Sequence, residues 1–526
     1  MAGPCSPLTR RTVLIGTAAM LSTTSLGAGC ATRPPADPRS QPLRDPFTVG
    51  VASGDPAADG VVLWTRLAPS PLADDGLGGM PPRPVDVEWE LATDEGFRQV
   101  EQRGRSVAVP EAGHSVHIEL TGLRPGGEYF YRFRAAGHLS PVGRTRTAPA
   151  PTTTGSALTM CFASCSQYEH GWFTAYRRLA AEHPDVILHL GDYQYEYATD
   201  DYSLPGGNVR HHVGPETETL ANYRQRYAQY KTDPDLQAAH AVAPWLVLWD
   251  DHELDNNWAD EVPENSQTGF RTRRAAAFQA YYENMPLRRS SMPRGIDMQL
   301  YRRVQWGGLV TFHLLDTRQY RDDQPCSDQF MSDCPQRPDP TRSITGAEQE
   351  SWLLDGFRRS QARWNVLGQQ VFFSQLDLTP GPGRGFNVDA WDGYVGSRDR
   401  IVAGLRNSPV RNAVVLTGDV HSHWAAEIRE RFDDPTSTAV GTELVSSSIT
   451  SGGDGSETRP EMAAVLAENP HIRFFNNRRG YVRTRFTPDE LRADFHVVPF
   501  VSQPDAAVQT AASFVVPDRD PTLHPA

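Results

Sequence analysis

The stretch PDVILHLGDYQYE, residues 184–196, decides the fold of the larger part of this 526-residue chain. Its apolar run from Val186 to Leu190 starts after a proline and ends at Gly191, which is typical of a short strand buried on both faces. Asp192 and Tyr195 follow directly after the strand. The sequence therefore predicts a buried strand with polar, chemically active side chains beyond its carboxyl end.

Other apolar runs repeat this pattern and alternate with amphipathic segments. One helix is predicted to start at Thr345, where Thr345 and Glu348 form a capping box. Such alternation predicts an α/β domain with buried strands, placed at residues 157–515. The polar stretches at 199–218 and 323–343 are predicted loops. The further predicted strands are 157–164, 245–249, 309–316, 363–371 and 412–418.

The preceding part, residues 46–148, has a different pattern. Short runs at 61–67, 85–93, 114–120 and 129–136 alternate apolar and polar residues and are separated by Gly, Pro and Asp. Regular short strands of this kind predict a small all-β sandwich. The string TGLRPGGEYFY at 121–131 is similar to the fibronectin type III signature, in which the residues corresponding to Leu123 and Tyr129 face the core.

The first thirty residues have the pattern of a targeting signal. Residues 9–14, TRRTVL, have the twin-arginine pattern, and a weakly apolar run follows. We predict a signal peptide at 1–30, export by the twin-arginine (Tat) machinery, and a Pro-rich linker at 31–45. The run ends at Cys30 in a partial lipoprotein box, which leaves two alternatives: a plain exported protein (periplasmic or extracellular) or a lipoprotein anchored to the membrane at Cys30.

The remaining cysteines divide into two pairs. Cys326 and Cys334 bracket a polar loop, and an exported protein is predicted to close it as a disulfide. Cys161 lies within an apolar strand, where a buried structural thiol is usual. Cys165 lies past the end of that strand and needs another explanation.

The charge of the chain limits its partners. The formal net charge is −13, and nucleic-acid-specific binding is not expected because phosphate backbones need a basic surface. A phosphate substrate is still compatible with this charge, since a buried metal site can reverse the local field.

Side chains that could bind a metal ion or a phosphate group follow one strand after another in the larger domain. A single Asp after a strand is usually a turn or cap residue, but so many endings of this kind favour a shared site at the carboxyl edge of the sheet. These side chains are Cys165, Asp192, Tyr195, Asp250, Asp251, His252, Glu253, Asp316, Arg318, Arg321, Asp419, His421 and His423.

Three strings carry a family resemblance: GDYQYE at 191–196, WDDHE at 249–253 and TGDVHSHW at 417–424. They resemble the metallophosphoesterase blocks, and within that superfamily the PhoD-like branch. GVASGDP, FASCSQYEHGWF, LLDTRQYR, DAWDGY and SSSITSGG resemble the same branch, so that the likeness spans residues 47–500. The resemblance implies an α/β fold of the metallophosphoesterase type, a β-sandwich flanked by helices, behind a small all-β fibronectin type III-like domain.

The resemblance also implies a centre of two or three metals, with one ferric iron (Fe3+) and two calcium ions (Ca2+). Iron would take Cys165, Asp192 and Tyr195, and the best remaining ligands are Asp251, Asp419 and His421. Asp251 stands where other metallophosphoesterases have Asn, and Asp419 where they have His. Carboxylates at these positions suit calcium.

The implied activity is that of an alkaline phosphatase with monoesterase and diesterase action on small or polymeric phosphate esters. Hydroxide held by the cations would attack in line, His252 would orient or protonate, and Arg318 or Arg321 would clamp the phosphate. The alternative for both arginines is a surface salt bridge; Arg479 is a weaker candidate over the site. Two other functions stay open: a phosphodiesterase or phospholipase D acting on phospholipid or teichoic-acid-type diesters, and a non-enzymatic exported binding protein.

Overall fold

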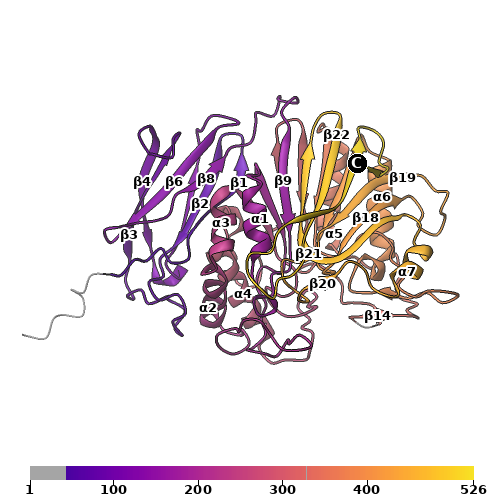
Figure 1. The fold of residues 1–526 in the computed structure, drawn as a ribbon, viewed down its shortest axis with the longest axis horizontal. Helices are drawn as coiled ribbons and strands as arrows, with labels where there is room; N and C mark the ends of the chain where they lie inside the picture. Colours follow the sequence, from indigo (N-terminus) through magenta and orange to yellow (C-terminus); the bar gives the residue numbers. More distant parts are fainter. Residues whose placement is uncertain (1–42, 327) are drawn as a thin grey trace, which may run out of the picture. The chain divides into compact units, whose positions relative to one another are not determined.

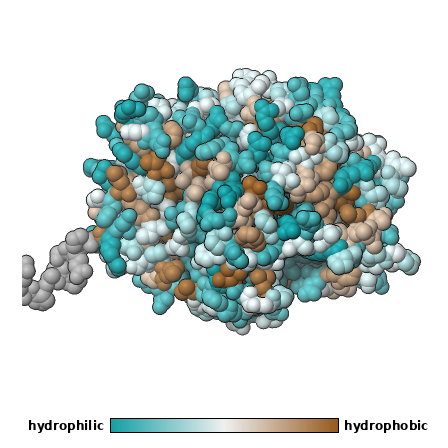
Figure 2. Space-filling model, viewed as in Figure 1, coloured by the Kyte–Doolittle hydropathy of each residue, from teal (hydrophilic) through white to brown (hydrophobic). Residues whose placement is uncertain are grey.

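The structure is a computed structural model that describes residues 43–326 and 328–526 (Figure 1). The predicted signal peptide, Cys30 and most of the predicted linker at 31–45 lie outside the described residues. Among the described helices, none has the length and apolar character needed to cross a membrane. The face drawn in Figure 2 is largely hydrophilic, and its hydrophobic residues form small separate clusters.

The N-terminal part is a β-sandwich, as predicted. Side chains from both of its sheets, among them Leu63, Val87 and Phe133, share one core. Leu123 and Tyr129 also face this core, and the Tyr129 hydroxyl accepts a hydrogen bond from the Arg124 N–H at 3.0 Å. One sheet contains β3 (Val85–Ala92), β4 (Val100–Ala108), β6 (Glu128–Ala135), β7 (His138–Leu139) and β8 (Gly143–Arg146), and the strands facing it are β1 (Val51–Ala57), β2 (Gly60–Arg66) and β5 (Ser115–Leu120).

The first sheet of the larger domain continues from this sandwich. Strand β1 pairs with β11 at Gly54 and Trp245. A Cβ at Gly54 would lie 2.4 Å from the Pro286 carbonyl oxygen, so only glycine permits this approach. The sheet has parallel strands β9 (Leu158–Ala163), β10 (Val186–Leu190) and β11 (Trp245–Leu248), and antiparallel strands β21 (Ile472–Phe486), β22 (Glu490–Val498), β23 (Gln509–Pro517) and β24 (His524–Pro525).

A second sheet packs against the first, and the long strand β21 joins them. Its beginning pairs with β18 and its later part pairs with β9. Met160, Leu188, Val366 and Leu416 come from both sheets and lie in one apolar core, which confirms the predicted sandwich. The second sheet contains β12 (Arg302–Trp306), β13 (Val310–Leu314), β15 (Trp364–Gly368), β17 (Ala413–Thr417), β18 (His423–Arg429) and β19 (Ala439–Val445).

Helices flank both sheets, as Figure 1 shows. Side chains of α1 (Thr174–Ala181), α2 (Leu220–Lys231), α3 (Pro234–Val242) and α4 (Phe270–Asn284) join the core that both sheets share. Those of α5 (Gly346–Arg359), α6 (Val395–Arg406) and α7 (Met462–Glu468) join a separate core with the second sheet. The 3-10 helices are η2 (Pro110–Ala112), η3 (Tyr168–His170), η4 (Arg289–Ser291) and η5 (Trp391–Gly393).

Helix α5 begins after Thr345 as predicted, but the predicted capping box is wrong. The Thr345 side chain makes no capping hydrogen bond, and its buried hydroxyl oxygen has no hydrogen-bond partner among the described residues. The reason is the backbone: Thr345 has φ −112° and ψ −8°, whereas a capping side chain reaches the helix from an extended residue.

The two predicted polar loops hold little regular structure. Residues 323–343 contain only β14 (Phe330–Met331), paired with β16 (Phe386–Asn387), among the described residues. The predicted Cys326–Cys334 disulfide is present, with the two Cα atoms 5.8 Å apart. Cys161 and Cys165 are buried free thiols.

The boundaries at 46–148 and 157–515 remain predictions. Residues 43–526 form one compact unit, and β24 lies beyond residue 515. The short strand β20 (Gly455–Ser456) pairs with β21.

Candidate metal centre

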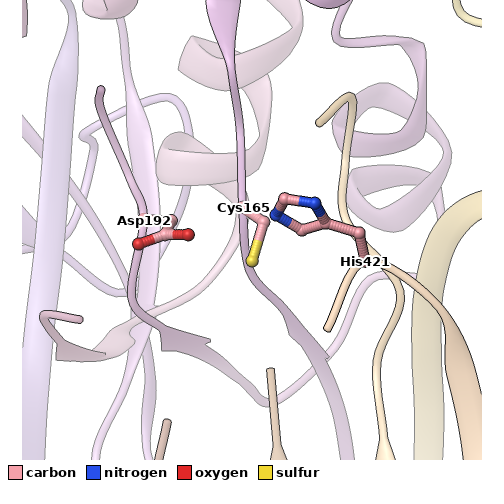
Figure 3. A group of neighbouring side chains, drawn as sticks. All are labelled: Cys165, Asp192 and His421. Carbon is pink, nitrogen blue, oxygen red and sulfur yellow. The ribbon is translucent and has the colours of Figure 1, made fainter. Parts of the chain in front are cut away.

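The strand ends converge as the sequence predicted. Three overlapping groups of side chains each hold their candidate ligand atoms within 4.8 Å of one another. Figure 3 shows the first group, in which the His421 imidazole is directed toward Cys165. The groups are Cys165–Asp192–His421, Asp192–Asp251–His252 and Asp250–Asp251–Asp419.

The backbone is strained where these side chains enter the site. Cys165, Asp192, Asp419 and His421 have φ values of 63°, 55°, 62° and 51°. Each such conformation costs a non-glycine residue about 1–3 kcal/mol and persists only where the surroundings hold it. Backbone hydrogen bonds join the Cys165 loop to the Asp192 loop. The Cys165 N–H donates to the Gly191 carbonyl at 3.1 Å, and the Ser166 N–H donates to the Asp192 carbonyl at 2.8 Å. All four residues contribute side chains to the ligand groups.

Tyr195 completes the group that contains the thiol. Its hydroxyl donates to Asp192 Oδ2 at 2.9 Å and lies 3.2 Å from His421 Nε2. It also accepts a hydrogen bond from Ser451 Oγ at 2.7 Å. The sequence did not indicate with which ligands His421 would group; the structure places it with Cys165. A thiol, a phenol and an imidazole together are the donors that a transition metal prefers.

The third group is different because it offers only oxygen. Asp250, Asp251 and Asp419 present carboxylates to one another, and Asp251 Oδ2 is oriented by the Asn257 N–H at 2.9 Å. All-oxygen sites suit calcium or magnesium. Asp250 was not among the predicted ligands, although it is the first Asp of the quoted string WDDHE.

Arg318 lies beside Asp250 and Asp251 but does not satisfy every oxygen of these carboxylates. Asp192 Oδ1, Asp250 Oδ2 and Asp251 Oδ1 are buried with no hydrogen-bond partner among the described residues. Burial, followed by the negative charge of neighbouring carboxylates, raises the pKa of Asp419 well above its usual range. Burial also raises the pKa of Asp192. Burial and the nearby Asp192 carboxylate together raise the pKa of the Cys165 thiol. Bound cations would reverse both effects, so the residues present fit a metal centre.

Glu253 holds two of the ligand loops together. Its carboxylate accepts hydrogen bonds from the Asp192 N–H at 3.0 Å, the Tyr193 N–H at 2.5 Å and the Asp250 N–H at 2.8 Å. Burial raises its pKa to about 8. Glu253 is therefore a positioning residue; the sequence placed it among the side chains at the strand ends but did not predict this role.

His252 is a member of the second ligand group and contacts Glu196. Its Nδ1 is 2.8 Å from Glu196 Oε2, and its ring stacks on Tyr195 with 4.1 Å between centroids. Burial opposes the charged form, but Glu196, Asp251 and Asp192 outweigh it and raise the His252 pKa well above its usual value. Such a group can donate a proton.

The two predicted phosphate-binding arginines are buried in ion pairs. Arg318 Nε lies 2.6 Å from Asp250 Oδ1, and Arg318 Nη1 lies 2.9 Å from Asp389 Oδ1. Arg321 Nη1 lies 2.6 Å from the same Asp389 oxygen. The alternative of a surface salt bridge is wrong, because both arginines are buried. Their contact with phosphate stays a prediction, and the only sequence signal for Asp389 was the string DAWDGY.

The remaining candidates, His423 and Arg479, have structural contacts. His423 Nδ1 accepts a hydrogen bond from the Ser447 N–H at 3.0 Å, away from the ligand groups. Arg479 Nη1 donates to Ser448 Oγ at 2.7 Å and to the Ser451 carbonyl at 2.5 Å. Arg479 thus supports the segment whose Ser451 hydroxyl contacts Tyr195.

Comparisons with known proteins agree with this geometry. The sequence matches the PhoD-like phosphatase family over residues 160–495 and the N-terminal domain of PhoD-like phosphatases over residues 29–149. It is 50% identical over 472 residues to alkaline phosphatase D of Bacillus subtilis (strain 168), covering 89% of this chain and 80% of that protein.

Two solved structures are also similar. The structure of PhoD superposes with a TM-score of 0.89 and 49% identity, covering 92% of both chains. The purple acid phosphatase PPD1 from yellow lupin (Lupinus luteus) seeds superposes with a TM-score of 0.53 at 13% identity, covering 89% of this chain and 73% of that one. The second likeness concerns the fold alone.

Proposed function

The chain belongs to the PhoD-like phosphatase family and is a phosphoester hydrolase, and we propose that the buried cluster around Asp192 is its catalytic metal centre. One observation carries this proposal: three buried carboxylate oxygens, on Asp192, Asp250 and Asp251, belong to overlapping ligand groups and have no hydrogen-bond partner among the described residues. Arg318 lies 2.6 Å from Asp250 Oδ1 and 3.7 Å from Asp251 Oδ1, yet burial still raises the pKa of Asp250 to about 7.

The centre would hold one ferric iron and two calcium ions. Iron suits Cys165, Asp192, Tyr195 and His421, because these residues offer sulfur, phenol and imidazole donors. Calcium suits the oxygen donors that remain, and Asp251 stands between the two groups. A ferric ion with a phenolate ligand absorbs visible light. We expect Tyr195→Phe to lose that absorption band while calcium stays bound.

The chain's own residues then orient and protonate the substrate. Bound cations would neutralise phosphate oxygens and acidify a water. Glu253 fixes the loops that present Asp192 and Asp250, and Arg318 fixes Asp250 from the other side. His252, charged and oriented by Glu196, would give its proton to the departing alcohol.

Hydrolysis of simple esters tests this function. The metal-loaded protein is expected to hydrolyse p-nitrophenyl phosphate and its bis-ester, to lose both activities in chelator, and to regain them with ferric iron and calcium. Cys165→Ser is the matched variant, since it keeps the size of the side chain and replaces sulfur with oxygen. Full activity of the metal-free protein would contradict the proposed centre.

We also propose export by the twin-arginine route, on the strength of residues 9–14 alone. Replacing Arg10 and Arg11 by lysine is expected to keep active protein inside the producing cell. Export that continues in this variant would contradict the proposal. Mass analysis of the mature N-terminus would separate a free terminus from a lipid on Cys30.

A further inference from the structure

One buried hydroxyl group contacts the candidate metal centre although it belongs to none of the ligand groups. It is the hydroxyl of Ser451, which is fully buried in the segment between β19 and β20. Its Oγ lies 2.7 Å from the phenol oxygen of Tyr195 and 2.9 Å from the Cys165 carbonyl oxygen. It also accepts a hydrogen bond from the Gln167 N–H at 3.1 Å. Ser451 therefore joins the two segments that carry Cys165 and Tyr195.

The backbone around Ser451 is held by hydrogen bonds of its own. The Ser451 carbonyl accepts from Ser448 Oγ at 2.7 Å and from Arg479 Nη1 at 2.5 Å. The N–H of the next residue, Gly452, donates to His170 Nδ1 at 3.0 Å. The Ser451 hydroxyl is therefore presented from a fixed backbone on both sides, and its position beside Tyr195 is preformed.

The Ser451 hydroxyl has one hydrogen to donate and two acceptors within reach. The Cys165 carbonyl has other donors, because it also accepts from the backbone N–H groups of residues 449–451 at 3.2–3.4 Å. The Tyr195 oxygen has no backbone N–H donor among the described residues. The phenol therefore depends on the Ser451 hydrogen more than the carbonyl does.

The two remaining contacts of the Tyr195 oxygen are both with candidate ligands. Asp192 Oδ2 lies at 2.9 Å and His421 Nε2 at 3.2 Å. Side chains bind a metal ion in their deprotonated form, through lone pairs. In that state the phenol has no proton to give to Asp192, and a ring nitrogen that holds the metal cannot donate to Tyr195. Ser451 is then the hydrogen-bond donor that remains in contact with the Tyr195 oxygen.

We propose that Ser451 is a positioning residue that acts through Tyr195: its hydroxyl holds the phenol oxygen toward the metal centre and withdraws electron density from it. This inference rests on the proposed function, because it needs a metal ion bound to Tyr195. Groups that hydrogen-bond to a metal ligand orient that ligand and tune the metal. A donor at the Tyr195 oxygen stabilises the oxygen lone pairs, so that they are given less strongly to the metal.

The visible absorption band of the ferric protein tests this inference. Light of this band moves electron density from the Tyr195 oxygen toward iron, and the energy required falls when the oxygen lone pairs are less stabilised. Ser451→Ala is therefore expected to move the band to longer wavelength and to lower the affinity for iron about tenfold. A loaded variant whose band stays at the wild-type wavelength would overturn the inference.

Ser447→Ala is the matched control for this variant. Ser447 lies in the same segment and is also fully buried, but its hydroxyl oxygen has no hydrogen-bond partner among the described residues. The control is expected to keep the wild-type band and the wild-type affinity for iron. If it shifts the band as far as Ser451→Ala does, the effect is not specific to Ser451 and the inference is wrong.

A measurement on the wild-type protein remains decisive even if Ser451→Ala does not fold. Resonance Raman spectroscopy with excitation in the visible band records the carbon–oxygen stretch of the bound phenol oxygen. A hydrogen bond from an exchangeable hydrogen makes this frequency differ between protein loaded in H2O and protein loaded in D2O. We expect such a difference, and identical frequencies in the two solvents would overturn the role of Ser451.

The outcomes separate this inference from the proposed function. If the iron-loaded wild-type protein lacks the band, or if Tyr195→Phe keeps it, the proposed iron ligands are wrong. If the wild-type protein has the band and Tyr195→Phe loses it, but Ser451→Ala leaves it unchanged, the metal centre stands and the role of Ser451 fails.

Discussion

Two neighbouring clusters of buried carboxylates differ in how their charge is balanced. Asp389 has arginines on both sides: its Oδ1 accepts hydrogen bonds from Arg318 at 2.9 Å and Arg321 at 2.6 Å. Burial would raise its pKa, but the two arginines outweigh burial and lower it. Asp192 is equally buried, yet its Oδ1 has no partner among the described residues and burial raises its pKa well above the usual range.

The difference teaches how a binding site differs from a structural ion network. Two arginines outweigh burial at Asp389, whereas His252 near Asp192 and Arg318 near Asp419 do not outweigh it there. Buried charges that lack a partner are costly. The shortage therefore marks the place where positive charge must come from outside, and the comparison can be tested by changing either cluster.

The largest expected effect is on activity, in the unbalanced cluster. Asp192→Asn keeps the shape but removes the charge, and we expect phosphatase activity to fall on the order of 1,000-fold, the scale seen when a preorganised electrostatic group is lost. The measurement is kcat/KM with p-nitrophenyl phosphate. Asp201→Asn, an exposed position near the site, is the control and is expected to keep full activity.

The second effect is on stability, in the balanced cluster. Asp389→Asn keeps the shape but removes the negative charge that pairs with Arg318 at 2.9 Å and with Arg321 at 2.6 Å. We expect the free energy of unfolding to fall by about 3 kcal/mol, as for other broken buried ion pairs. Denaturant unfolding in chelator measures it. An unchanged midpoint in that experiment would show that the two clusters do not differ as described.

The third effect is a pH dependence of the metal-free protein. Burial raises the pKa of Asp250 to about 7 and that of Glu253 to about 8. The pKa values of these groups in the unfolded chain are near 4. Between about pH 4 and the folded pKa values the folded state therefore binds more protons than the unfolded state. The free energy of unfolding falls as pH rises through this range. One such group gives a loss of about 2 kcal/mol from about pH 5 to about pH 6.5.

Thermal unfolding in chelator at the two pH values measures this loss. The metal-loaded protein is expected to show a smaller decrease, because bound cations favour the ionised carboxylates. A metal-free protein that becomes more stable over this range would contradict the assigned charge balance.

The smallest effect belongs to an exposed ion pair. Arg359 pairs with Asp355 at 3.0 Å on the surface of α5, with its side chain 79% exposed. Arg359→Gln is expected to change the free energy of unfolding by less than about 1 kcal/mol, with no change in activity. This variant sets the baseline against which both buried clusters are measured.

The sequence predicted the fold well because its signals are local. The run at 186–190 is a strand, the N-terminal part is a β-sandwich, and the Cys326–Cys334 disulfide is present. The capping box at Thr345 failed because Thr345 has φ −112° and ψ −8° instead of an extended conformation, and Gly346 after it has φ 69°. A motif of side chains cannot show that constraint.

The site was only partly predictable for a different reason. Strand ends reveal which residues meet at one edge of a sheet, and so Cys165, Asp192, Asp251, Asp419 and His421 were found. The strand ends do not reveal which of these residues form hydrogen bonds or ion pairs with one another. The pairing of Asp389 with Arg318, and the hold of Glu253 on two loops, depend on contacts between segments far apart in sequence.

Elemental analysis of the wild-type protein against Asp192→Asn, both purified without chelators, tests the central claim most directly. The charge shortage predicts two or three bound ions per wild-type chain, including one transition metal, and the loss of at least one ion in the variant. Wild-type protein that is fully active without bound metal, or a variant that keeps every ion, would contradict it.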